Sequence, residues 1–95
     1  MAWDVIVRAA RVSDTLKAEL GAMASRFESE DEWLRGVCTH LEEIIEDPAE
    51  YVDYWDLENE EAVSATMIGS IAKELYGRVD KILAMPMNKR GSREW

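Results

Sequence analysis

Residues 28–61 read ESEDEWLRGVCTHLEEIIEDPAEYVDYWDLENEE, and this stretch decides the fold. In its first half the apolar residues recur at spacings of three and four, which is the pattern of one buried face on an α-helix. Ser29 and Glu32 stand at the spacing of a capping box, and the acidic residues between them suit the positive end of a helix dipole. The stretch therefore predicts an amphipathic helix over about 30–46.

A second, shorter helix is predicted directly after the first one. The residue before a proline is pushed out of the helical region, so Pro48 ends the preceding helix. The same proline suits the first position of a new helix, with Asp47 as its N-cap and Glu50 able to close a second capping box. We therefore expect a short helix over about 48–56.

The segments on either side carry longer apolar stripes. The N-terminal stripe predicts a helix over about 3–27. Ser13 is a candidate N-cap that would divide this segment, but the stripe keeps its phase across Ser13, so we favour one helix. The C-terminal stripe predicts a helix over about 60–85 that Pro86 ends. Its apolar residues are Val63, Met67, Ile71, Leu75, Val79, Ile82 and Leu83.

These patterns predict an all-α protein, a small helical bundle of three main amphipathic helices and one short helix. Residues 1–86 are expected to form a single helical domain, because a chain of 95 residues is short enough for one domain. Residues 87–95 show no periodicity and are expected to form a mobile basic C-terminal tail. The first helix has the spacing of a coiled-coil seam, and both outer helices are long for 95 residues. We therefore expect a homodimer that buries their second faces.

The charge of the chain is −9 and is unevenly distributed. Residues 28–61 hold fourteen of the 20 acidic residues and one base, Arg35, whereas the rest of the chain has more bases than acids. Binding to nucleic-acid phosphates needs clustered bases, so we expect no direct nucleic-acid binding. The negative field of the acidic stretch would instead steer a basic protein partner toward it.

The remaining sequence signals narrow the class of protein. The longest apolar run is far shorter than the roughly 20 residues of a membrane span, and no signal-peptide pattern is visible. We therefore expect a cytoplasmic protein without membrane contact. Cys38 and His40 are two residues apart, which on a helix turns their side chains about 160° from each other and prevents a dyad. His40 is predicted to be a structural histidine, and no catalytic residue, metal or cofactor is assigned.

The candidate binding surface covers residues 42–56, where acidic and aromatic side chains crowd a turn and a short helix. Carboxylates select a basic partner, and aromatic residues supply anchors that become buried on binding. Helical spacing predicts that Tyr54 is exposed, while Tyr51 and Trp55 pack into the core. This pattern predicts a non-enzymatic acidic module for protein–protein interaction. The predicted partner-binding residues are Glu42, Glu43, Glu46, Glu50, Asp53, Tyr54 and Asp56.

Part of the acidic stretch is similar to the immunity proteins of DNase colicins, which are small acidic four-helix proteins with a very short third helix. The matching residues are Glu30, Asp31, Glu32, Thr39, His40, Glu42, Glu43, Pro48, Tyr54 and Trp55. The resemblance implies an inhibitor that caps a basic nuclease. The residues that it implies to face the nuclease are Leu34, Cys38, Glu42, Tyr54 and Trp55.

Two alternatives stay open. The run from Glu42 to Glu46 looks like the E-E-x-x-E motif of MazG-type nucleotide pyrophosphohydrolases, which implies an all-α oligomeric enzyme whose Glu42, Glu43 and Glu46 hold magnesium. The second motif of that family, E-x-x-D, lies well downstream, whereas here Glu50 and Asp53 follow almost at once. The other alternative is a structural subunit of a larger complex.

Overall fold

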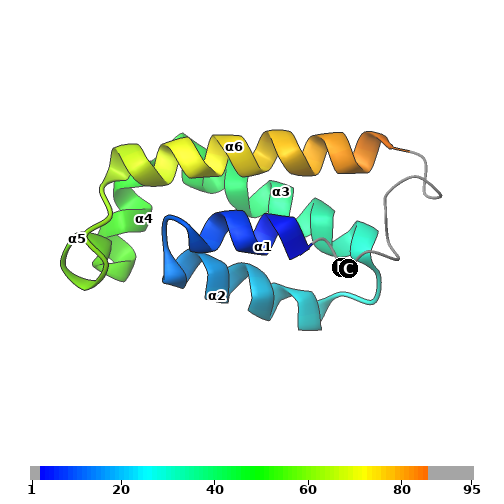
Figure 1. Ribbon diagram of the computed structural model, residues 1–95, viewed down its shortest axis with the longest axis horizontal. Coiled ribbons are helices and arrows are strands. Elements are labelled where there is room, and N and C mark those ends of the chain that lie inside the picture. Colours follow the sequence, from blue (N-terminus) through cyan, green and yellow to red (C-terminus); the bar gives the residue numbers. More distant parts are fainter. Residues whose placement is uncertain (1–2, 86–95) are drawn as a thin grey trace.

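The computed structural model describes residues 3–85 of the chain, so the tail predicted at 87–95 lies outside the described residues. Over this range the all-α prediction is confirmed, since the chain forms helices and no strand (Figure 1). The helices are α1 (Trp3–Ala10), α2 (Asp14–Met23), η1 (Ala24–Arg26, a 3₁₀ turn), α3 (Glu30–Glu46), α4 (Pro48–Trp55), α5 (Leu57–Glu60) and α6 (Ala65–Ala84).

Four helices form the body of the molecule. Both α1 and α3 pack against α2 and α6, so the order around the bundle is α1, α2, α3, α6. The short helices α4 and α5 lie together at one end of the bundle (Figure 1). The largest fully buried side chains are Trp33, Leu16, Leu20, Leu34, Leu41, Leu57, Ile68, Leu75, Val5, Val37, Val63 and Val79.

The prediction of one helix over 3–27 is wrong, because the chain folds back between α1 and α2. Ser13 has an extended backbone, and its hydroxyl accepts a hydrogen bond of 3.1 Å from the Leu16 N–H, which makes it the N-cap of α2. Both helices still contribute apolar side chains of the predicted stripe to the core, since Val5 and Leu16 are fully buried. The homodimer prediction thus loses the long first helix as its support, and it stays a prediction.

The last helix begins later than predicted. It starts at Ala65 instead of near residue 60, with Ser64 as its N-cap. Ala62 has a left-handed backbone with φ 56°, which separates the single turn of α5 from α6. Met67 is 43% exposed, although the predicted stripe includes it. The bounds predicted for α3 and α4 agree with the structure to within one residue.

Glu61 joins the loop before α6 to the turn between α1 and α2. Its carboxylate accepts hydrogen bonds from the Ser13 hydroxyl at 2.6 Å, from the Thr15 hydroxyl at 2.6 Å and from the Thr15 N–H at 2.9 Å. Burial alone would raise the pKa of Glu61, but these donors outweigh it and hold the pKa below its usual value. The carboxylate is therefore ionised at neutral pH and fixes the turn.

Trp33 anchors α3 to the end of α2. Its indole is 1% exposed and donates a hydrogen bond of 3.0 Å to the backbone carbonyl of Leu20. In a regular α-helix the N–H of Ala24 would bond the Leu20 carbonyl. Here α2 tightens into the 3₁₀ turn, and this N–H is directed at the carbonyls of Gly21 and Ala22 instead. The indole N–H thereby satisfies a carbonyl at the end of α2, where intrahelical donors run out.

Two glycines allow close approaches between elements. A Cβ on Gly36 would lie 2.6 Å from Cζ of Phe27, so the ring packs directly on the backbone of α3. A Cβ on Gly69 would lie 3.2 Å from Cγ of Pro48, where α4 meets α6. The second contact brings α4 close to the backbone of α6.

The capping role of Ser13 can be measured by truncation. We expect Ser13→Ala to lower the free energy of unfolding by about 1–2 kcal/mol, because α2 loses its cap. Ser25→Ala is the matched control, since that hydroxyl is exposed and bonds only the Ala22 carbonyl of its own helical turn. We expect a change within about 0.5 kcal/mol for this control. Equal losses in urea denaturation would show that the α1–α2 turn does not depend on Ser13.

The close packing of Phe27 on Gly36 can be tested with a pair of helical glycines. A Cβ on Gly21 would have no atom within 4 Å, so Gly21→Ala should stabilise the protein by about 0.5–1 kcal/mol through helix propensity. Gly36→Ala should bring no such gain, because the new methyl group displaces the Phe27 ring. Thermal unfolding of both variants gives the comparison, and equal gains would contradict the packing.

Candidate functional site

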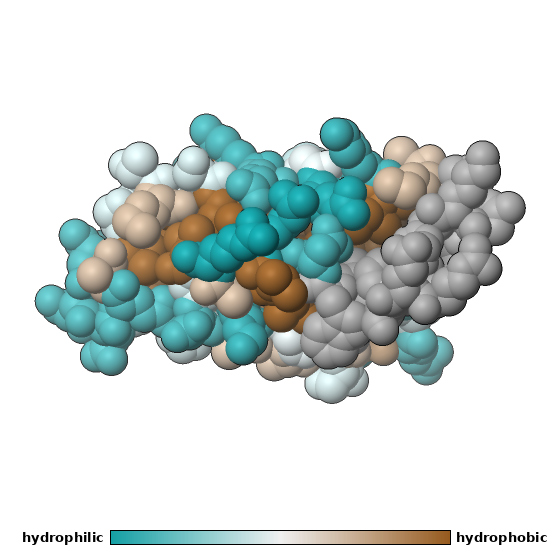
Figure 2. Space-filling model, viewed as in Figure 1, coloured by the Kyte–Doolittle hydropathy of each residue, from teal (hydrophilic) through white to brown (hydrophobic). Residues whose placement is uncertain are grey.

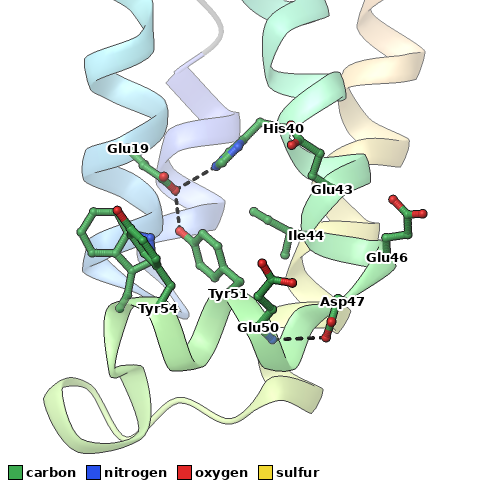
Figure 3. A pocket seen from close by; sticks show the side chains of 10 residues that line it. Glu19, His40, Glu43, Ile44, Glu46, Asp47, Glu50, Tyr51 and Tyr54 are labelled. Atoms are coloured by element: carbon green, nitrogen blue, oxygen red, sulfur yellow. Dashed lines mark hydrogen bonds and ion pairs between the residues drawn. The ribbon is translucent and has the colours of Figure 1, made fainter.

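An open groove of about 720 Å³ lies between α2, α3 and α4 (Figure 3). Its wall includes most of the turn between α3 and α4, where the sequence places its acidic and aromatic residues. The lining residues are Glu19, His40, Glu43, Ile44, Glu46, Asp47, Glu50, Tyr51, Tyr54 and Trp55.

Five carboxylates line the groove, four of them at the α3–α4 turn, and no Lys or Arg is among its described lining residues. Glu43 and Glu46 come from the last turns of α3, and Glu50 comes from the first turn of α4. Asp47 lies between these helices and caps α4, since its Oδ1 accepts a hydrogen bond of 3.2 Å from the Glu50 N–H. The groove therefore has a strongly negative rim.

An aromatic pair forms one side of the groove. Tyr54 is 78% exposed and Trp55 is 39% exposed, and their rings meet edge to face with centroids 5.0 Å apart. The prediction that Tyr54 is exposed is confirmed, whereas the prediction that Trp55 packs into the core is wrong. Tyr51, one helical turn before them, is only 8% exposed and packs inward as predicted.

The centre of the groove is a hydrogen-bonded group from three helices. Figure 3 shows it between Tyr54 and the carboxylates of the α3–α4 turn. Oε1 of Glu19 on α2 lies 2.9 Å from Nε2 of His40 on α3 and accepts a hydrogen bond of 2.5 Å from the Tyr51 hydroxyl on α4. The rings of His40 and Tyr51 also meet edge to face at 6.2 Å. Glu19 thus links all three helices at one oxygen.

The protonation states follow from these contacts. Burial alone would raise the pKa of Glu19, but the hydrogen bonds from His40 and Tyr51 outweigh it and hold the pKa below its usual value. An ionised carboxylate only accepts, so Nε2 of His40 is the donor to Glu19. This hydrogen bond raises the pKa of His40 against the opposing effect of burial. Burial and the nearby Glu19 raise the pKa of Tyr51, which therefore keeps its proton.

The structure brings together four of the seven predicted partner-binding residues, namely Glu43, Glu46, Glu50 and Tyr54. Glu42 lies on another side of α3, where its Oε1 accepts a hydrogen bond of 3.3 Å from the Tyr76 hydroxyl of α6. The E-E-x-x-E glutamates therefore do not point into one site.

The other two predicted residues, Asp53 and Asp56, are exposed but do not line the groove. Asp56 instead ends α4 with a left-handed backbone at φ 52°. Its Oδ1 accepts a hydrogen bond of 2.9 Å from the Asn59 side chain. Its role in the structure is therefore to shape the connection from α4 to α5.

Sequence reasoning missed Glu19 as a member of the site. Glu19 lies outside residues 28–61 and belongs to α2, so only the fold brings it to His40. The expectation of a structural histidine is consistent with its contacts, because the ring is half-buried and hydrogen-bonded to Glu19. The surface implied by the resemblance to immunity proteins needs a correction, since Leu34 is fully buried and cannot face a partner.

The described residues contain neither a candidate metal site nor a membrane-spanning helix. Within residues 3–85 there is no group of three or more His, Cys, Asp or Glu side chains that could hold a metal ion. None of the helices in this part of the chain is long and apolar enough to cross a membrane. Comparisons with protein-family models, with curated proteins and with solved structures give no match for this chain.

The coupling of His40 to Glu19 should appear in an NMR titration, because His40 is the single histidine of the chain. We expect its pKa above the usual 6.5, and we expect Glu19→Gln to lower it by removing the charge and the strongest acceptor. Glu43→Gln is the matched control and should lower this pKa less, since Glu43 acts only through its charge. An unchanged pKa in Glu19→Gln would show that the pair does not form in solution.

The same pair gives a pH dependence of stability. His40 has a raised pKa in the folded protein, so its contact with Glu19 contributes fully below the unfolded pKa of about 6.5. The contribution is lost as pH rises through the higher folded pKa of His40. We therefore expect the difference in unfolding free energy between the wild type and Glu19→Gln to shrink as pH rises above 6.5, measured by urea denaturation at several pH values.

Proposed function

We propose that this chain is a non-enzymatic, cytoplasmic interaction module that binds a basic protein partner through the groove between α2, α3 and α4. One observation carries the proposal: a groove of about 720 Å³ combines five carboxylates with an aromatic pair that the fold leaves exposed. Large exposed aromatic residues in a folded protein commonly mark a binding surface. Because carboxylates line the groove, the partner must carry positive charge.

The occupant that fits the groove is a Lys- or Arg-bearing segment. A guanidinium or ammonium group above the rings of Tyr54 or Trp55 would gain a cation–π contact, and the same group could pair with Glu50 or Glu46. The ionised Glu19 adds negative charge at the centre of the groove. His40 and Tyr51 already bond this carboxylate and Asp47 caps α4, so a cation would pair with Glu43, Glu46 or Glu50.

The sharper form of the proposal is an inhibitor of the immunity-protein type. A partner with a positively charged functional surface, such as a nuclease, would be blocked when the acidic rim covers that surface. Support for this form comes from the exposed Tyr54 and Trp55, which the resemblance also places at the interface. Leu34 has no part in it, because it is buried.

Binding can be tested with a fluorescent Lys/Arg-rich peptide, with a Glu-rich peptide of equal length as the negative probe. We expect the basic peptide alone to bind, more weakly as salt rises. The double variant Glu46→Gln/Glu50→Gln should weaken binding about tenfold, which is what two exposed ion pairs typically contribute. Tyr54→Ala should weaken it by a similar factor and leave the salt dependence unchanged, because it removes an uncharged anchor.

The matched control is Glu58→Gln/Glu60→Gln, which removes the same charge from exposed positions on α5 outside the groove. We expect this variant to bind like the wild type. If both double variants lost affinity equally, the effect would come from net charge and not from the groove. Affinity capture from the native host with the wild type and Tyr54→Ala would then identify the natural partner, which only the wild type should retain.

A further inference from the structure

A second groove, of about 360 Å³, lies on α1 and α6 and has the opposite charge. Its lining residues are Arg8, Lys73, Glu74, Gly77, Arg78 and Lys81. Four of the six are bases and one is an acid. The sequence pattern predicts no role for this surface, although the bases outnumber the acids outside residues 28–61.

The shape of this groove follows from the spacing of its residues on α6. Lys73, Gly77 and Lys81 recur every four residues and therefore share one face of the helix. Gly77 has no side chain, and no atom lies within 4 Å of the place where a Cβ would be, so the space between the two lysines stays open. Both lysine residues are exposed, about 12 Å apart along the helix axis.

The arginines of the groove are held in place by acids from the same two helices. Nε of Arg78 donates a hydrogen bond of 2.6 Å to Asp4, and Nη1 of Arg8 donates one of 3.2 Å to Glu74. Nε of Arg8 also lies 3.7 Å from Asp4. Figure 2 shows hydrophilic side chains across the middle of the face that α1 and α6 share, with hydrophobic residues on both sides of them. The guanidinium groups are thus positioned before any partner arrives.

The two grooves lie on opposite faces of the bundle. The order around the bundle is α1, α2, α3, α6, so the side between α2 and α3 is opposite the side between α6 and α1. The first side carries the groove between α2, α3 and α4, called the acidic groove below. The second side carries the groove on α1 and α6, called the basic groove. One molecule therefore presents complementary charges in two opposite directions.

We propose that the basic groove of one copy docks against the acidic groove of a second copy, so that the chain assembles head to tail. The inference rests on the proposed function, because it names the basic partner as this chain itself. Lys73 and Lys81 meet the carboxylates of the α3–α4 turn, and Tyr54 and Trp55 offer rings to these cations.

The contact joins two different surfaces, so it is heterologous and differs from the homodimer expected from the long helices. In an open assembly, each added copy leaves one acidic and one basic groove unoccupied at the ends. Such a contact propagates into a ring or an open array, and it does not stop at a symmetric dimer. Because the carboxylates and bases are exposed, salt weakens the contact.

The first measurement is sedimentation velocity of the full chain at several protein concentrations in low and in high salt. We expect the mean mass to rise with concentration at low salt and to fall to that of one chain at high salt. A monomer under all conditions would overturn the head-to-tail contact. The basic-peptide assay would still decide the proposed function independently, so the two failures are distinguishable.

Neutralising variants then test the geometry. Lys73→Gln/Lys81→Gln removes charge from the basic groove, and Glu46→Gln/Glu50→Gln removes it from the acidic groove. Each variant alone should associate about tenfold more weakly than the wild type. An equimolar mixture should form a complex of two copies and no larger species, because each variant keeps one native groove.

The control for the bases is Arg11→Gln/Lys17→Gln, which neutralises two exposed bases outside the groove and should associate like the wild type. A mixture that forms no complex of two copies would overturn the proposal. A dimer that persists at high salt would overturn it as well, because an apolar, symmetric interface would then be responsible.

Discussion

The hydroxyl group of Ser13 is the contact on which the rest of the arrangement depends. It caps α2 and donates to Glu61, so one side chain both begins the second helix and ties the turn before it to the loop before α6. Because α2 turns back along α1, Glu19 comes within hydrogen-bond distance of His40 on α3. If residues 3–27 formed one straight helix, α2 would continue away from α1 and the wall of the acidic groove would be missing.

The parts of the fold that the sequence predicts well are those with local causes. The start of α3 depends on Ser29, and the boundary between α3 and α4 depends on Asp47 and Pro48, all of which act within one helical turn. The break at Ser13 could not be predicted from local signals. The apolar stripe favoured one continuous helix, whereas Ser13 as an N-cap favoured two helices. The residue that favours the break, Glu61, is 48 positions further along the chain. The left-handed backbone at Ala62 has no local signal at all, since alanine prefers a helix.

The candidate site likewise combines residues that the local sequence predicts with residues that only the complete fold brings together. Glu43, Glu46, Glu50 and Tyr54 are close in sequence and come together in the groove, as expected. Neighbouring residues on a helix point about 100° apart, so Glu42 and Glu43 had to face different surroundings. Which of them faces the groove depends on where α6 packs against α3, and the periodicity of one helix does not contain that information. The contribution of Glu19 from α2 required the whole bundle for the same reason.

The bond between Glu61 and the backbone of Thr15 joins residues 46 positions apart, and this bears on how the protein loses its structure. Closing the loop between them costs conformational entropy that only the assembled bundle compensates. The α1–α2 hairpin and the loop before α6 should therefore separate together, in a step that also removes Glu19 from the groove. A molecule bound in the groove would then slow amide hydrogen exchange across the whole bundle, and not only in the helices that it touches.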